Sequence, residues 1–295
     1  MVNDGGLLIG QLEITEVGRL AGTSFEKWRI LARTSHEDPS HKMPWKLSVQ
    51  LTFDCRLHGQ VVLSYHGDQR KRMFVGHFAI GFGAKRWAPK TSVGTLMFAT
   101  LLADLLLFLF VAVGIEHISI RPGITRVNAL NLYDFAWSHS LVMDVVWGAL
   151  LAAAYFLTRR YRRGAWVLFA AVLSHWVLDW ASHRPDMPLA PGLHRYYGLG
   201  LYNSPLGLLI VEGGLWVIGI ILYLRATHAR RFAGHLVLWT IIAVFTALWL
   251  ISFNGASPPS VHVLVTVDLI LFPIVFGWAY WIDRLRQPNE TSAHL

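Results

Sequence analysis

Apolar segments of about 20 residues recur along the chain from residue 73 onward. A bilayer core of about 30 Å needs roughly 20 apolar residues in a helix, because each residue adds about 1.5 Å. Lipid offers backbone groups no water to bind, so segments of this length are expected to be helices packed side by side. We therefore predict an all-α, polytopic membrane bundle with six long spans, at about residues 92–114, 138–158, 164–182, 204–224, 232–253 and 261–282.

A seventh apolar segment, at about 73–88, is too short to cross a bilayer alone, and we expect a half-spanning or re-entrant helix there. The composition agrees with a membrane protein: 54% of residues are hydrophobic and only 15% are charged, against about 25% charged in soluble domains. The single Cys55 excludes an intrachain disulfide framework and a Cys-rich metal site. Any metal must therefore bind His, Asp and Glu.

Three regions follow from this pattern. Residues 1–72 are mixed and polar, with no signal peptide of the usual form. They form either a poorly ordered or small cytoplasmic extension or an upstream over-translation, with Met73 as the true start. Residues 73–286 form the integral membrane domain, and 287–295 a polar C-terminal tail.

Loops rich in basic residues alternate with loops that hold few, and this pattern predicts the orientation of the bundle in the membrane. The loops that we assign to the cytoplasm and the C-terminal flank hold most of them, whereas the alternate loops hold only Arg121, Arg126, Arg184 and Arg195. The positive-inside rule then places the C-terminus in the cytoplasm. It also explains the net charge of +8, so we expect the lipid bilayer as partner and no nucleic acid. The cytoplasmic set is Lys85, Arg86, Lys90, Arg159, Arg160, Arg162, Arg163, Arg225, Arg230, Arg231, Arg284 and Arg286.

The third long span carries the clearest chemical signal. His175, Asp179 and His183 stand at i, i+4 and i+8, so they share one face of a helix. Ionisable groups in a span cost roughly 2.5–3.5 kcal/mol each on insertion scales and usually mark a functional site. Imidazole with carboxylate is a common ligand set for a transition metal, and we favour a metal here over a structural hydrogen-bond network.

Other ionisable residues are expected at a similar depth, in the outer half of the bilayer. Asp104 and Glu212 lie within spans, His139 opens the second long span, and His77 lies in the short segment. Glu116 lies in the outer loop 115–137, where a solvated role is the default, although it could reach the mouth of a site. Lone histidines elsewhere, and Asp144 and Asp268, are interpreted as interfacial or bundle-pairing residues.

Ser138 lies beside His139, a combination that could indicate nucleophilic catalysis. Neighbours at i±1 on a helix point in different directions, so we expect no direct Ser–His pair.

These residues and their order resemble a known family. Gly76-His77, Asp104, Ser138-His139-Ser140 and Ser174-His175-Trp176-Val177-Leu178-Asp179 are similar to the motifs of the YdjM-type family of bacterial inner-membrane proteins, described as metal-dependent hydrolases. The resemblance covers about residues 73–183. It implies that His77, Asp104, His139, His175 and Asp179 are metal ligands or active-site groups, and that the protein lies in a bacterial inner membrane. The family usually pairs carboxylates where this chain has only Asp104, a deficit that His183 could compensate, so the number of metal ions stays open.

The resulting hypothesis is a membrane-embedded hydrolase that uses a divalent metal, Zn²⁺ or Mn²⁺, on a lipid or lipid-linked phosphoester. The metal ligands would come from His77, Asp104, His139, His175, Asp179 and His183, with Glu212 or Glu116 as general base. Two alternatives remain open: a proton- or ion-coupled transporter that uses the same groups, and a non-catalytic membrane protein in which metal or an internal network fixes the bundle.

Overall fold

The computed structural model describes strand residues between 11 and 66 and the segments 75–253 and 257–289. The chain divides into two units, Met1–Gln69 and Arg70–Leu295. In the first unit, four antiparallel strands pair in the order β1–β4–β5–β6, and β2 pairs with β3. Residues 1–72, for which we weighed an extension against over-translation, thus contain a sheet, while Met73 lies outside the described residues. The strands are β1 (Gln11–Glu16), β2 (Arg19–Leu20), β3 (Thr23–Ser24), β4 (Lys27–Ser35), β5 (Lys46–Cys55) and β6 (Gly59–His66).

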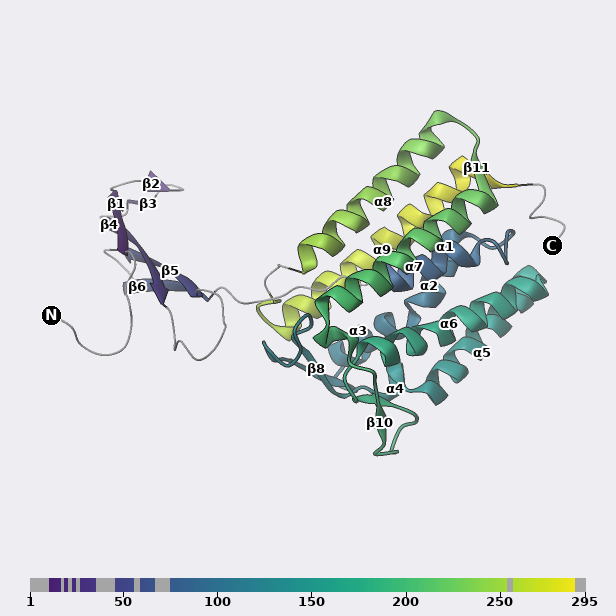
Figure 1. Ribbon diagram of the computed structural model, residues 1–295, viewed down its shortest axis with the longest axis horizontal. Coiled ribbons are helices and arrows are strands. Elements are labelled where there is room, and N and C mark those ends of the chain that lie inside the picture. Colours follow the sequence, from purple (N-terminus) through teal and green to yellow (C-terminus); the bar gives the residue numbers. More distant parts are fainter. Residues whose placement is uncertain are drawn as a thin grey trace. The chain divides into compact units, whose positions relative to one another are not determined.

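The second unit is the predicted helical bundle (Figure 1). Within the part of the chain that the structure describes, five helices are long and apolar enough to cross a membrane: α5 to α9. The predicted span at 92–114 is broken into α2 and α3, which meet at a bend of 58° and make a sixth crossing if they count as one span. The helices are α1 (Val75–Ala84), α2 (Val93–Thr100), α3 (Leu102–Ala112), α4 (Ala136–His139), α5 (Leu141–Arg159), α6 (Arg162–Ser182), α7 (Pro205–Ala226), α8 (Phe232–Ser252) and α9 (Val261–Leu285).

The two ends of the bundle differ in their connections (Figure 1). One end, called here the hairpin end, carries two short antiparallel pairs, β7 (His117–Ile120) with β8 (Leu130–Asp134) and β9 (Met187–Pro188) with β10 (Tyr196–Tyr197). The other, called the basic end, carries the predicted cytoplasmic loops and the pair β11 (Thr227–Ala229) with β12 (Arg286–Pro288). The first residues of the predicted polar tail are therefore paired in β12, and residues 290–295 lie outside the described part.

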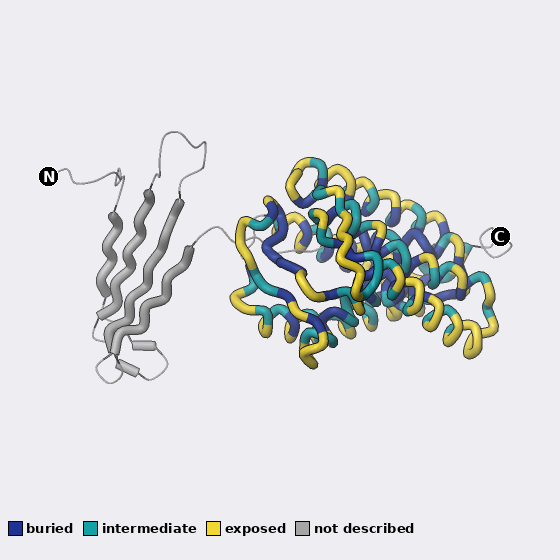
Figure 2. The backbone as a smooth tube through the Cα atoms, turned by 90° about the horizontal axis from the view of Figure 1, so that it is seen from below, coloured by how far each residue is buried: buried dark blue, intermediate teal, exposed yellow. Residues whose placement is uncertain are grey.

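The outer face of the bundle is apolar, and exposed residues line the outside of the long helices (Figure 2). Leu157, Ile210 and Ile251 are each more than 60% exposed. Large apolar surfaces of this extent are unfavourable in water, whereas lipid covers them at no cost. The chain is a multi-pass membrane protein.

Helix α1 lies inside the bundle, as expected for a short segment that cannot cross alone. Nine of its ten residues are buried, and ten helical residues span about 15 Å, half of a bilayer core. Its close partner is α7, where a β-carbon at Gly219 would lie 2.4 Å from the carbonyl oxygen of Ala79. Glycine therefore allows the two backbones to touch, as in other membrane bundles. This packing holds the first turn of α1, with His77, in the bundle interior.

Candidate metal centre

Five predicted ligands from four helices converge near the hairpin end. They form two overlapping groups that share His175: His77, His175 and Asp179, and Asp104, His139 and His175. Within each group, one ligand atom per residue lies within 4.8 Å of the others. The convergence brings α1, α3, α4 and α6 together around one small volume.

The spacing of the ligand atoms matches that of a metal coordination shell. His175 Nε2 lies 3.3 Å from His139 Nε2 and 3.2 Å from Asp179 Oδ2. His77 Nε2 lies 3.4 Å from Asp179 Oδ1, and His139 Nε2 lies 3.5 Å from Asp104 Oδ1. Ligands bound tetrahedrally at 2.0–2.1 Å from Zn²⁺ are separated by roughly 3.3 Å. The nearest ligand atoms are therefore spaced as they are around a divalent transition metal.

The break between α2 and α3 orients His175. Helix α2 ends at Thr100, and the Thr100 carbonyl oxygen lies 2.8 Å from His175 Nδ1. A carbonyl can only accept, so Nδ1 carries the hydrogen and Nε2 presents its lone pair to the cluster. Such a hydrogen bond to the second ring nitrogen is the usual support of a metal-binding histidine.

A buried relay orients His139 in the same way. His139 Nδ1 lies 2.8 Å from Ser138 Oγ, and this hydroxyl donates to Glu116 Oε2 at 2.6 Å. Because the only hydroxyl hydrogen of Ser138 is given to Glu116, Ser138 Oγ accepts from His139 Nδ1, and His139 Nε2 is left with its lone pair. Glu116 is held in turn by the amides of Trp137 and Ser138, at 2.8 and 2.9 Å from Oε1.

Two sequence-based expectations are wrong here. Glu116 is not solvated but fully buried, because the chain after α3 turns back and places its carboxylate under α4. Burial raises the pKa of its carboxyl, against hydrogen bonds from Ser138 and Trp137 that favour the charged form. Ser138 and His139 do pair, because α4 is a single turn that ends at His139, so the directions of a long regular helix do not apply.

The orientation of the two imidazoles brings two nitrogen lone pairs close together. Both Nε2 lone pairs point into the cluster and lie 3.3 Å apart. With a hydrogen on each Nδ1, the two lone pairs would repel each other at this distance, and a cation between them, a metal ion or an added proton, would relieve the repulsion.

Access to the cluster differs from ligand to ligand. The side chain of Asp104 is 24% exposed, whereas those of His139 and Asp179 are 2% and 6% exposed. His77 and His175 are equally buried, at 5% and 1%. Asp104 is thus the most exposed of the five residues, and the other four are buried. An accessible position is typical of catalytic metal sites, whereas structural sites are closed.

His183 lies at the edge of the cluster and belongs to neither group. Helix α6 ends at Ser182, so His183 is the first residue beyond the regular helix. Its Nε2 is 4.0 Å from Asp179 Oδ2, while its Nδ1 lies 3.1 Å from Asp186 Oδ1. The predicted alignment with Asp179 holds, because the His183 amide still bonds to the Asp179 carbonyl, but the ring is engaged by Asp186 at the edge of the cluster.

Glu212 also lies outside both groups. It is buried on α7 and accepts a hydrogen bond of 2.8 Å from Trp249 Nε1. Its Cγ lies 3.8 Å from the position that a β-carbon would take at Gly76, so it adjoins the first turn of α1, beside His77.

The sequence interpretation missed three contributors. Asp144, in the first turn of α5, is fully buried and interacts electrostatically with His139 and His175. Thr100 and Ser138 support the two histidines. Asp144 could have been recognised in the sequence, because it is a carboxylate one helical turn after Ser140. The Thr100 carbonyl could not, because every residue carries a backbone carbonyl.

Comparisons with family models, curated proteins and solved structures found no match to this chain. The resemblance to the YdjM-type family stays a prediction, and the functional argument depends on the geometry of the cluster.

Proposed function

We propose that this protein is a membrane-embedded, metal-dependent hydrolase whose centre is held by His77, Asp104, His139, His175 and Asp179. The observation that carries the proposal is the 3.3 Å distance between Nε2 of His139 and Nε2 of His175, two imidazoles whose Nδ1 atoms are each engaged by an oxygen behind the ring. A third imidazole and two carboxylates at tetrahedral spacing favour a metal ion over a proton as the cation between them. Zn²⁺ or Mn²⁺ suits this mixture of nitrogen and oxygen ligands.

A divalent ion held by these five residues would activate water as a nucleophile near neutral pH and would polarise a phosphoryl or acyl oxygen. The chain provides the rest. Asp104 stands at the accessible side, where a reacting group enters. Glu116 is fixed by Ser138 and Trp137 and acts through His139, so we assign it to positioning and not to proton transfer. Glu212, which interacts electrostatically with Asp179, remains the candidate general base.

The surroundings of the cluster favour an amphiphilic substrate. The ligands lie within apolar helices near the hairpin end, and the accessible Asp104 belongs to a helix, α3, that is rich in Leu and Phe. A lipid or lipid-linked phosphoester would bring its polar group to this depth while its chains stay in the bilayer. We propose this substrate class and place the site in the outer leaflet of a bacterial inner membrane, with the C-terminus in the cytoplasm.

Fully buried apolar side chains form a layer between the cluster and the basic end, beyond which Lys85 and Asp283 form a largely buried ion pair. Phe82, Leu96 and Leu168 are all fully buried there. A transport path requires polar groups through both leaflets. The apolar layer separates the two polar regions and therefore supports a one-sided site over the transporter alternative.

Metal analysis of the purified protein tests the proposal. In detergent, the wild type should bind about one or two equivalents of Zn²⁺ or Mn²⁺. The double variant His175→Ala/Asp179→Ala should lose them, because Asp179 lies within 4.0 Å of four imidazoles, including His175. Mass spectrometry gives the metal content, and circular dichroism checks the helical fold.

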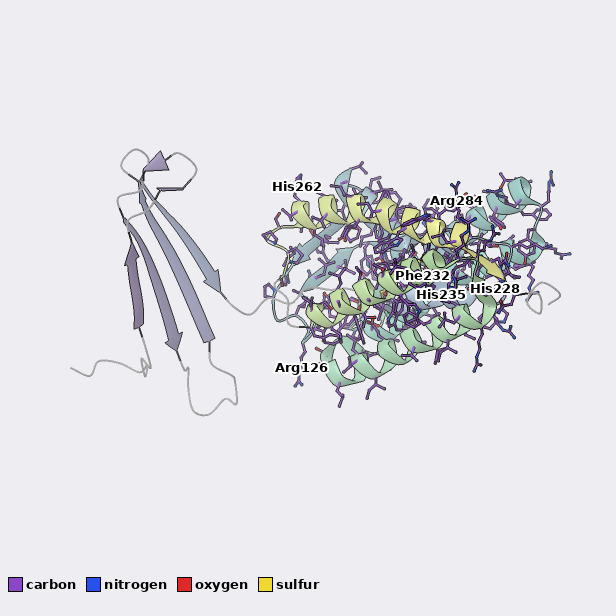
Figure 3. All side chains as sticks on the ribbon, turned by 90° about the horizontal axis from the view of Figure 1, so that it is seen from above. Arg126, His228, Phe232, His235, His262 and Arg284 are labelled. Carbon is purple, nitrogen blue, oxygen red and sulfur yellow. The ribbon has the colours of Figure 1, made fainter. Side chains whose placement is uncertain are left out.

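Two histidines on the outside of the bundle provide the control. His235 on α8 and His262 on α9 (Figure 3) are exposed, and neither belongs to the two groups of ligands. Their replacement by alanine should leave the metal content unchanged. Wild type without metal after incubation with Zn²⁺ or Mn²⁺ would refute the metal centre. A bound metal without turnover of phospholipids or lipid-linked phosphates, and with lower thermal stability after its removal, would favour the structural alternative.

A further inference from the structure

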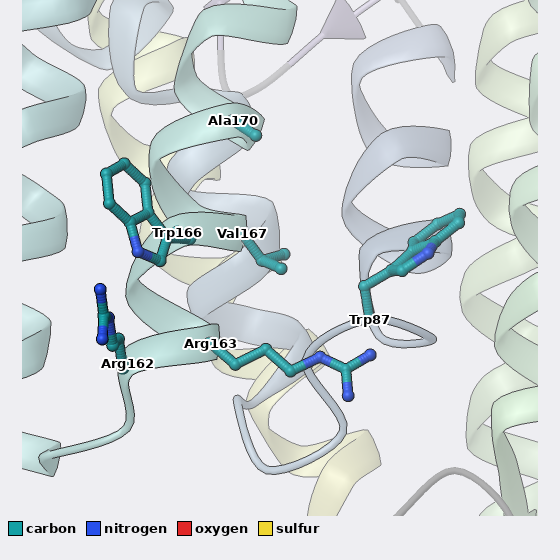
Figure 4. Close-up of a pocket in the computed structure, with 6 residues that line it drawn as sticks. All are labelled: Trp87, Arg162, Arg163, Trp166, Val167 and Ala170. Carbon is teal, nitrogen blue, oxygen red and sulfur yellow. The ribbon is translucent and has the colours of Figure 1, made fainter. Parts of the chain in front are cut away.

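A surface groove lies at the basic end, away from the metal cluster. It has a volume of about 560 Å³. A second cavity of about 300 Å³ continues it along the surface between α1, α6 and α7, and the two share Trp87, Val167 and Ala170. The first part is lined by Trp87, Arg162, Arg163, Trp166, Val167 and Ala170 (Figure 4).

Small side chains explain the groove. Ala79 and Gly83 of α1 and Ala170 and Ala171 of α6 line its second part, where larger side chains would close the space. Helix α1 ends at Ala84, so it does not extend farther along the face of α6 that lines the groove. An apolar channel is therefore open to the surrounding lipid.

Two cations stand at the mouth of the channel. Arg162 and Arg163 occupy the first turn of α6, where the positive end of the helix dipole makes basic side chains unfavourable. The preceding residue, Tyr161, makes no side-chain capping hydrogen bond, so the first amides of α6 gain no partner from it. Among the described residues, no ion pair joins either arginine to a carboxylate. An anion at this point would offset the repulsion between the arginines and the helix dipole, and it would accept hydrogen bonds from the first amides of α6.

Two tryptophans frame the same mouth. Trp87 is 51% exposed and Trp166 is 62% exposed. Arg163 extends across the groove toward Trp87, while Arg162 lies beside Trp166 (Figure 4). Tryptophan prefers the level of the lipid headgroups, so the mouth lies at the membrane interface and the channel runs from it into the hydrocarbon region.

We propose that this groove binds an anionic phospholipid of the leaflet at the basic end. Its phosphate lies at the start of α6, where Arg162 and Arg163 supply positive charge from two sides, and an acyl chain follows the apolar channel between α1, α6 and α7. Both features are required: the arginines select negative charge, and the channel selects a chain. Because α1 also carries His77, the bound lipid contacts the helix that supplies a ligand to the metal cluster.

Native mass spectrometry of the full chain in mild detergent tests the proposal. Phosphatidylglycerol and phosphatidylcholine with identical acyl chains serve as probes. Wild type should retain phosphatidylglycerol preferentially. Each arginine near a membrane surface contributes about fivefold to the binding of an anionic lipid, so Arg162→Gln/Arg163→Gln should lower the affinity about 25-fold. Phosphatidylcholine binding should change little.

The matched control is Arg230→Gln/Arg231→Gln. It removes the same charge from exposed positions at the same end, before α8, that do not line the groove. This variant should retain the preference for phosphatidylglycerol. An equal loss in both double variants, or no preference in wild type, would overturn the proposal, because the effect would then be one of general charge.

A steric variant tests the channel separately from the charge. Ala170 is exposed and lines both parts of the groove, so Ala170→Phe should fill it and weaken the binding of both lipids severalfold. Ala153→Phe, on the exposed face of α5, is the control for an added ring. Unchanged lipid binding in Ala170→Phe would refute the acyl-chain channel, as would full competition by a water-soluble glycerophosphate at equal concentration. Metal content is measured in parallel and should stay at the wild-type value.

Discussion

The two ends of helix α6 place charge in opposite ways. At the C-terminal end, His175 and Asp179 are buried and surrounded by partners within 4 Å. At the N-terminal end, Arg162 and Arg163 line an open groove with no carboxylate partner among the described residues. One helix therefore holds a closed polar cluster near the hairpin end and an open cationic mouth at the basic end.

The difference follows from the cost of charge at each depth. Inside the bundle an isolated charge is expensive, so ionisable groups are paired, and each adds a constraint on its neighbours. At the interface, water and headgroups solvate an arginine, so it need not be paired within the protein. Ionisable groups that meet in the buried interior therefore indicate a small, tightly bound ion. Arginines that meet at an open groove indicate an exchangeable lipid.

The largest expected effect separates the two carboxylates of the cluster. Asp179 lies within 4.0 Å of His77, His139, His175 and His183, whereas Asp104 lies this close only to His139 and His175. Asp179→Asn should lower metal affinity by more than about 100-fold, beyond the roughly 10- to 100-fold cost of losing an outer partner. Asp104→Asn should cost less affinity and yet abolish turnover, because Asp104 stands at the accessible side. Metal titration with a competing chelator measures the affinities, and equal losses would contradict the unequal roles.

A smaller effect concerns the relay behind His139. In Ser138→Ala, His139 Nδ1 loses its acceptor and the ring is free to change tautomer, so we expect a loss of about 10-fold or more in metal affinity. Ser174→Ala is the matched control, since Ser174 stands beside His175 as Ser138 stands beside His139, but its hydroxyl bonds to the Ala171 carbonyl of its own helix. The chelator titration should separate the two variants, and similar affinities would refute the positioning role.

The smallest effect is expected at His183. Its Nε2 is 4.0 Å from Asp179, and its Nδ1 is engaged by Asp186. His183→Ala should therefore change metal affinity by no more than about twofold to threefold, the scale of a weakened outer contact. A loss as large as that of Asp179→Asn would restore His183 as a ligand.

The sequence predicted a large part of the candidate site, for a simple reason. His175 and Asp179 are four residues apart on one helix, and this spacing fixes their proximity without any knowledge of the fold. Asp104 and His139 were recognised because charge is costly in an apolar span. Glu116 was misjudged because its position in a loop is visible in the sequence, whereas its burial depends on how the loop turns back under α4.

The sequence alone determined that this chain forms a helical membrane bundle, because hydrophobic length and the absence of water allow few other structures. It also determined which residues were too polar for their surroundings. Only the tertiary structure decided which lone pairs face each other, since this depends on the break after Thr100 and on the single turn that ends at His139. The groove at the basic end was likewise decided by the tertiary structure, because a channel is the space that small side chains on three helices leave between them.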